Sequence, residues 1–131
     1  QGYYSCSKFA IEGFSEALSA EVKGFGISVS LVEPGDFATN FTAMRVQSEA
    51  TLADEEYGPL YRKALQIFEK EENGGLKPDF MAKQVEKIVD AKHPHLRYCV
   101  ANFVQKLSVY LKRIIPGNCN VDILRSYYNL K

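Results

Sequence analysis

Apolar residues recur every three to four positions near the start of the chain, and this spacing predicts a helix over residues 5–23. Its expected inner stripe consists of Ala10, Ile11, Phe14, Ala17, Leu18 and Val22. Gly24 stands where a helix C-cap is expected. A run of β-branched and apolar residues then predicts a buried strand over residues 27–32, which Pro34-Gly35 ends. This order of elements indicates an α/β sheet.

The pattern after Gly35 is mostly helical. It predicts four further helices, over residues 52–72, 78–92, 102–115 and 121–130. The helix that opens at Pro78 is expected to turn its apolar side chains inward, namely Met81, Val85, Ile88 and Val89. Residues 96–100 could form a second short strand. One or two strands do not make a sheet by themselves, so partner strands are expected from outside this chain.

Charge and length exclude several classes of protein. The 131 residues carry 16 basic and 16 acidic side chains, so nothing suggests the basic surface of a nucleic-acid partner or attraction to an acidic membrane. No apolar run has the length of a membrane-spanning helix. The three cysteines are widely spaced, which favours a reducing, cytoplasmic location over a disulfide framework.

Three further groups of side chains are assigned no catalytic or binding role. His93, His95 and Cys99 lack an evident fourth ligand for zinc, so no metal site is predicted. The acidic patch Glu69, Glu71 and Glu72 fits a solvated helix face. Tyr127 and Tyr128 are expected to be packing residues.

Tyr4 and Lys8 stand four positions apart at the start of the first predicted helix, so both lie on one face. A free phenol ionises near pH ~10, and a nearby ammonium favours the ionised form. A phenol in this setting can exchange a proton as a carbonyl and an alcohol interconvert. The same spacing recurs at Tyr127 and Lys131, so only the surrounding sequence can decide between the two pairs.

The surrounding sequence favours the first pair. Tyr4-x-x-x-Lys8 is followed by a helix, a short strand and then Pro34-Gly35-x-x-x-Thr39. In this order and separation, the two motifs resemble the short-chain dehydrogenase/reductase family from its active-site helix onward. The resemblance is close over the first part of the chain and looser over the rest.

The resemblance implies an α/β fold, namely the C-terminal part of a Rossmann-type doubly wound parallel sheet that is mostly helical here, with one or two strands. Residues 1–131 would be a C-terminal fragment of one such domain. The N-terminal cofactor-binding half, with its glycine-rich turn and the residue that selects NAD or NADP, would be absent. A serine and an asparagine of the family's catalytic group would also precede Tyr4. The fragment, proteolytic or truncated, is therefore expected to be inactive and to hold no cofactor.

The resemblance also implies the role of individual residues toward NAD or NADP. Tyr4 would exchange the proton at the substrate oxygen, and Lys8 would bind the nicotinamide ribose. Pro34-Gly35 would shape the turn under the nicotinamide. The backbone around Phe37 and the Thr39 hydroxyl would hold its carboxamide, although Thr39 also fits an ordinary helix N-cap.

Residues 40–77 would form a mobile lid over a small-molecule substrate. The apolar lid residues expected to set specificity are Phe41, Met44, Val46 and Leu52. They hint at a lipophilic steroid, retinoid or fatty ketone. The helix over residues 5–23 would pack against its twin in a homo-oligomer, most simply a dimer.

Two functions fit these observations. The first is an NAD(P)-dependent oxidoreductase that interconverts a carbonyl and a secondary alcohol. The alternative is a non-catalytic interaction or assembly module that retains the family sequence. The complete pair of Tyr4 and Lys8 favours the enzyme, because a module has no need of it.

Overall fold

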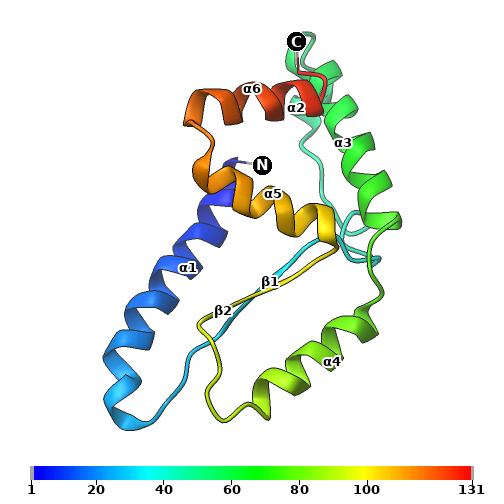
Figure 1. Ribbon diagram of the computed structural model, residues 1–131. Coiled ribbons are helices and arrows are strands. Elements are labelled where there is room, and N and C mark those ends of the chain that lie inside the picture. The colour runs from blue at the N-terminus through cyan, green and yellow to red at the C-terminus, as the bar shows by residue number, and fades with distance from the viewer. Residues whose placement is uncertain (1, 131) are drawn as a thin grey trace. The chain divides into compact units, whose positions relative to one another are not determined.

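The computed structural model describes residues 2–130 and is mostly helical, with a two-stranded parallel sheet (Figure 1). This composition is that of part of a Rossmann-type α/β fold, as the sequence predicts. The chain divides into two compact units. The first unit is the chain up to Pro34 together with Met81–Val100, and the second is Gly35–Phe80 together with the chain from Ala101 onward.

The first helix, α1 (Gly2–Val22), begins before the predicted start at residue 5 and continues into a short 3₁₀ helix, η1 (Lys23–Phe25). The residue that ends η1 is Gly26, in the left-handed conformation with φ 74°, and its N–H donates to the Lys23 carbonyl at 3.2 Å. The predicted cap at Gly24 is therefore wrong. The tighter final turn carries the helical segment two residues further before the chain reverses.

The covered face of α1 is polar in its middle and apolar only toward its end, so the predicted apolar stripe is confirmed in part. Ser15 is buried, whereas Ile11 and Phe14 are 53% and 66% exposed. Leu18 and Val22 are half-buried, as predicted. In the middle of the helix, Glu12 and Glu16 pair with Arg97.

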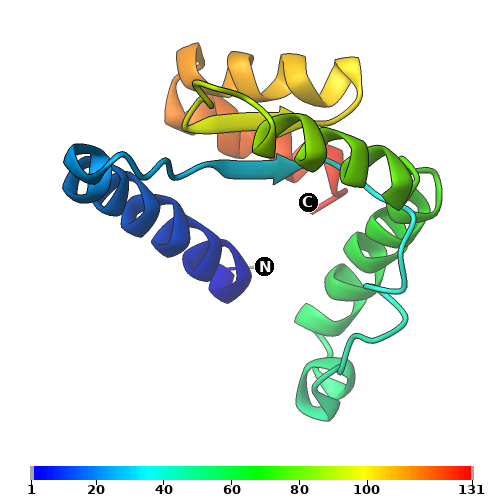
Figure 2. The same ribbon diagram turned by 90° about the horizontal axis from the view of Figure 1, so that it is seen from below.

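The sheet pairs β1 (Leu31–Pro34) with β2 (Arg97–Val100) in parallel, and Figure 2 shows the two strands side by side. The predicted strand over residues 96–100 is confirmed. The other strand begins later than the predicted residue 27, because pairing starts only where Leu31 faces Arg97. The Leu31 N–H donates to the Leu96 carbonyl at 2.7 Å.

The helix α4 (Pro78–Val89) begins at the predicted proline. Met81 and Ile88 are half-buried, as expected for the inner stripe. Val85 and Val89 are exposed, so the prediction that they turn inward is wrong. The covered stripe of α4 is thus narrower than its apolar pattern.

In the second unit, the helix predicted over residues 52–72 is two helices, α2 (Glu49–Ala53) and α3 (Tyr57–Asn73). Asp54 causes the break. Its carboxylate accepts hydrogen bonds from the Glu56 and Tyr57 N–H groups, at 3.0 and 2.6 Å. A short acidic side chain that bonds nearby amides competes with helix continuation and favours a new helix start.

The C-terminal helices are α5 (Phe103–Ile114) and α6 (Gly117–Tyr127). Asn102 caps α5 with a reciprocal pair of bonds to Gln105: its side chain accepts from the Gln105 N–H at 2.9 Å, and the Gln105 side chain accepts from the Asn102 N–H at 3.4 Å. The last helix starts at Gly117, earlier than the predicted residue 121.

The core is small. Its buried apolar residues are Leu65, Val100 and Ala101, and no side chain among residues 2–130 is fully enclosed. In the second unit the ring of Phe68 packs against that of Tyr128 in a tilted arrangement, with centroids 4.9 Å apart. In the part of the chain that the structure describes, every helix is too short or too polar to cross a lipid bilayer.

Candidate functional site

The two predicted catalytic side chains lie together on the first turns of α1. The Lys8 Nζ stands 5.5 Å from the centroid of the Tyr4 ring, a cation–π distance. The Ser7 hydroxyl donates to the Tyr4 carbonyl at 2.8 Å, within the same turn. Tyr4 is 49% exposed and Lys8 is also exposed, so a ligand can reach both. The second pair of this spacing cannot be compared, because Lys131 lies outside the described residues.

The Pro34-Gly35 turn is shaped by close packing. Pro34 ends β1 opposite Val100. In the second unit, a Cβ at Gly35 would lie 2.7 Å from the Cβ of Ala101 and would also strike the Gln105 side chain. Only glycine fits at that distance. The glycine is therefore required by the packing of this chain, whatever role it has toward a cofactor.

The backbone at Phe37 forms an isolated parallel bridge with Leu76. The two hydrogen bonds of the bridge run from the Leu76 N–H to the Asp36 carbonyl and from the Ala38 N–H to the Leu76 carbonyl, both at 2.9 Å. They leave the N–H and carbonyl of Phe37 outside the bridge. A Cβ at Gly75 would lie 2.6 Å from the Asp36 carbonyl carbon, so the bridge depends on glycine there.

The hydroxyl of Thr39 is engaged by Glu72 of α3. Thr39 Oγ1 donates to the Glu72 carboxylate at 2.9 Å and accepts from the Phe41 N–H at 3.2 Å. The Thr42 N–H also donates to Glu72, at 2.9 Å. No helix begins here, so the reading of Thr39 as a helix N-cap is wrong and the hydroxyl closes a turn instead.

The acidic patch on α3 differs from the predicted solvated face. Glu69 is exposed, as expected. Glu71 and Glu72 are half-buried and bonded, because Glu71 accepts from the Tyr127 hydroxyl and Glu72 holds the turn at Thr39. The spacing of these residues could not predict either partner, since Tyr127 and Thr39 both lie far from them in the sequence.

The expected lid residues are all exposed to solvent and do not line a common pocket. Phe41, Met44, Val46 and Leu52 are all exposed, and Val46 is 95% exposed. The Arg45 guanidinium lies 6.0 Å from the Phe41 ring and 5.9 Å from the Phe68 ring, which holds this part of the segment near α3. None of the four residues lines the cavity of the second unit.

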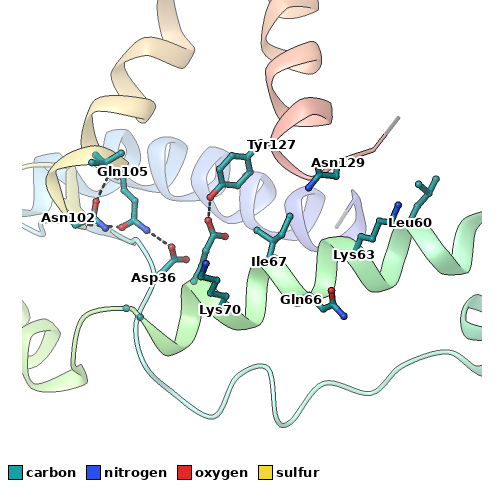
Figure 3. A pocket seen from close by; sticks show the side chains of 14 residues that line it. Asp36, Leu60, Lys63, Gln66, Ile67, Lys70, Asn102, Gln105, Tyr127 and Asn129 are labelled. Carbon is teal, nitrogen blue, oxygen red and sulfur yellow. Dashed lines mark hydrogen bonds between the residues drawn. The ribbon is translucent and has the colours of Figure 1, made fainter.

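That cavity has a volume of about 1060 Å³ and lies between α3 and the C-terminal helices (Figure 3). From α3 it is lined by alternating apolar and basic side chains, Leu60, Lys63, Ile67 and Lys70. On its rim Gln105 donates to the Asp36 carboxylate, and Tyr127 donates to Glu71. The bond to Glu71 raises the pKa of Tyr127 to about 12, and burial raises that of Tyr128. Sequence reasoning had not singled out this cavity.

Sequence reasoning also missed a cluster of three carboxylates around Arg97 in the first unit. Arg97 Nη1 lies 2.9 Å from Glu12 Oε2, and Nη2 lies 2.6 Å from Glu16 Oε1. Nη1 also pairs with Glu33 of β1. These contacts raise the pKa of Arg97 well above its ordinary value, chiefly through the hydrogen bond with Glu16. The available signal was that Glu12 and Glu16 continue the four-residue spacing of Tyr4 and Lys8.

No metal arrangement is present in the described part of the chain, where no group of three or more His, Cys, Asp or Glu side chains is placed to hold an ion. In the first unit the ring of His95 instead lies edge-on to that of Tyr98, with centroids 5.8 Å apart. Cys6 and Cys119 are free and exposed, and Cys99 is free and half-buried.

Comparison with known proteins identifies relatives of this chain. The family model for short chain dehydrogenases matches residues 1–50. The chain is 44% identical to a 3-ketodihydrosphingosine reductase from Bacteroides thetaiotaomicron, over all of this chain and 49% of that protein. It is 30% identical to an NADPH-dependent 3-dehydrocapnine reductase from Ornithobacterium rhinotracheale, over 84% of this chain and 40% of the relative.

The chain is also 48% identical to 17-beta-hydroxysteroid dehydrogenase type 6 from Mus musculus over 50 residues. That stretch is 38% of this chain and 16% of the relative. The chain thus spans about half, or less, of the length of these curated relatives. The matched segment contains both the helix with Tyr4 and Lys8 and the Pro34-Gly35 turn. On these grounds the chain belongs to the short-chain dehydrogenase family.

Proposed function

We propose that this protein is an NAD(P)-dependent oxidoreductase that interconverts a carbonyl and a secondary alcohol. The observation that carries the proposal is the placement of the Lys8 ammonium against the Tyr4 ring, with both side chains accessible on one end of α1. A phenol can donate the proton that a carbonyl oxygen needs when the carbon receives hydride. The nicotinamide, when bound, supplies that hydride.

We propose the following roles for residues of this chain toward the reduced cofactor. Tyr4 would protonate the substrate oxygen, and Lys8 would hydrogen-bond the nicotinamide ribose. Pro34, Gly35 and the backbone of Phe37 would border the nicotinamide, a role that membership of the family supports. The Thr39 hydroxyl, which bonds Glu72 in this structure, would then bond the carboxamide.

We further propose a lipophilic ketone with a long aliphatic chain as the substrate. Relatives named for 3-ketodihydrosphingosine and 3-dehydrocapnine support this class. The exposed apolar side chains of Phe41, Met44 and Val46 also support it, because an aliphatic substrate can cover them. A rigid steroid ketone is the competing class, suggested by the hydroxysteroid dehydrogenase.

Isolated residues 1–131 are proposed to lack this activity. The support is that the chain spans 49% of the relative matched over its full length, and that its sheet has two strands with both edges open. The test compares turnover of the 131-residue chain with that of the protein as encoded. Equal turnover by the two would contradict this part of the proposal.

The activity is tested on the encoded protein with NADPH and with NADH, using 3-ketodihydrosphingosine and a steroid ketone as alternative substrates. Tyr4→Phe is expected to lower turnover roughly 100- to 10,000-fold, because it removes the proton donor. Tyr127→Phe is the matched control, since Tyr127 heads the second Tyr-x-x-x-Lys spacing and should retain activity. Full turnover by Tyr4→Phe would contradict the proposed role of Tyr4, and a wild-type protein without turnover would leave the non-catalytic interaction module as the better interpretation.

A homodimer through α1 is also proposed, supported by the exposed apolar side chains of Ile11 and Phe14 beside the small residue Gly13. Ile11→Glu and Phe14→Glu should shift the mass measured by light scattering from dimer to monomer. Val89→Glu, at an exposed valine of α4, should leave the mass unchanged. A wild-type protein that is monomeric throughout would rule the dimer out.

A further inference from the structure

The side chains at positions 4, 8, 12 and 16 form one ridge along α1, because residues four apart lie one above another on a helix. The first half of the ridge is Tyr4 and Lys8, and the second half is Glu12 and Glu16. Both glutamates are bound by one guanidinium from β2, that of Arg97. The ridge with the proposed catalytic pair is therefore attached to the sheet through its acidic half.

The same guanidinium also pairs with Glu33 of β1. Arg97 faces Leu31 in the parallel register, and Glu33, two positions further along β1, lies on the same face of the sheet. Glu33 directly precedes Pro34, where the cofactor turn begins. One side chain thus links the helix of the proposed catalytic pair with the strand that leads to the proposed nicotinamide turn.

Apolar packing of α1 is limited to its last turns, where Leu18 and Val22 are half-buried. Nearer the proposed catalytic pair, the covered residues are Glu12 and Ser15, while the apolar Ile11 and Phe14 are exposed. A planar fork with five N–H donors can serve several carboxylates in fixed directions, which a lysine ammonium on a flexible stem cannot do. In the described part of the chain, the fork of Arg97 is thus the side chain that bonds this part of α1 to both strands.

We propose that Arg97 is a positioning residue, which holds the Tyr4–Lys8 ridge of α1 in register with the strand that ends at Pro34. The proposal rests on the proposed oxidoreductase function. Arg97 touches neither substrate nor cofactor, and it acts through Glu12, Glu16 and Glu33. Without it, three carboxylates would face one another with no cation between them, and their repulsion would move α1 away from the strands.

The placement of reacting groups affects the rate more than it affects substrate binding. A displacement of about 1 Å can slow a reaction roughly 100-fold. Ion pairs that are partly exposed, as these are, contribute little to global stability. Arg97→Gln is therefore expected to lower kcat about 10- to 100-fold with little change in KM for the ketone and little change in the midpoint of thermal unfolding.

The experiment uses the protein as encoded and compares Arg97→Gln with Arg97→Lys and with Arg113→Gln. Lysine keeps the charge but lacks the fork, so it should restore only part of kcat. Arg113 of α5 is the control arginine, because it lies outside the ridge and its guanidinium is 6.0 Å from the Tyr110 ring. Arg113→Gln should leave kcat unchanged. A parallel fall in kcat, KM and thermal midpoint, rescued fully by lysine, would overturn the proposal in favour of a merely structural charge.

A second readout does not depend on turnover. In Arg97→Gln, amide hydrogen exchange should quicken across α1, and in Arg113→Gln it should not. Unchanged exchange in α1 of Arg97→Gln would overturn the proposal even if activity were lost. If the wild-type protein reduces no ketone with either nicotinamide, the proposed function fails, and the exchange measurement still decides whether Arg97 anchors α1.

Discussion

The hydroxyl of Tyr127, in the last turn of α6, donates a hydrogen bond to the carboxylate of Glu71, near the end of α3. The two residues are 56 positions apart. The bond lies on the rim of the cavity in the second unit (Figure 3) and joins its two walls. The bond stabilises the fold only while Tyr127 keeps its phenol proton, since the phenolate would repel the carboxylate.

This bond predicts a specific loss of stability in alkaline solution. The pKa of Tyr127 is raised from its ordinary value of 10 to about 12, mainly by the hydrogen bond with Glu71. A raised pKa means that the folded state keeps its proton more tightly, so the stabilisation is complete below about pH 10 and is lost between about pH 10 and 12. Denaturant unfolding at pH 9 and pH 11.5 should show this loss in the wild type.

The controls for that prediction are Tyr127→Phe and Glu71→Gln. Both should reduce the fall in unfolding free energy between the two pH values, because Tyr127→Phe removes the titrating hydroxyl and Glu71→Gln removes the carboxylate that raises its pKa. Absorbance at 295 nm should also lose its latest-titrating tyrosine in Tyr127→Phe. An alkaline fall of the same size in all three proteins would show that the bond does not influence stability.

Gly35→Ala should destabilise the second unit by about 1–3 kcal/mol, the usual cost of overpacking. The added methyl would lie 2.7 Å from the Cβ of Ala101 and would strike Gln105. Thermal unfolding measures the effect. The double variant Gly35→Ala with Ala101→Gly should recover part of the loss, because it removes one of the two clashes. Wild-type stability in Gly35→Ala would mean that the backbone here moves apart freely.

Glu72→Ala should loosen the turn that follows Thr39. The carboxylate accepts from the Thr39 hydroxyl and from the Thr42 N–H, and a hydrogen bond to a charged group is worth about 1.5–3 kcal/mol. Amide exchange at Thr42 should therefore quicken by roughly ten-fold or more. Glu69→Ala, at an exposed neighbour on the same helix, serves as the control and should leave Thr42 unchanged.

Asn102→Ala should cost about 1 kcal/mol of unfolding free energy, because it removes the cap of α5. Asn102→Asp keeps an acceptor for the Gln105 N–H and should retain most of the stability. Chemical denaturation of the three proteins provides the comparison. Equal stability of the alanine and aspartate variants would argue that the cap is dispensable.

The features that the sequence predicted correctly depend on residues that are close together along the chain. The four-residue spacing of Tyr4 and Lys8 places both on one face of a helix, and Pro78 and Asn102 mark helix starts by their own backbone and side-chain preferences. The order of the Tyr-x-x-x-Lys and Pro-Gly motifs was sufficient to indicate the family. These features involve residues close together in the sequence, so the pattern alone reveals them.

Contacts between distant residues decided the rest. Arg97 is 85 positions from Glu12, and Thr39 is 33 positions from Glu72, so no periodicity could connect them. The apolar stripe of α1 predicted an inner face at Ile11, yet the ion pairs with Arg97 cover the polar face instead. The sequence by itself determined most of the helical segments, the Pro34-Gly35 turn and the family, because these follow from local spacing. Only the tertiary structure decided which faces are covered and which charges meet, because those depend on distant partners.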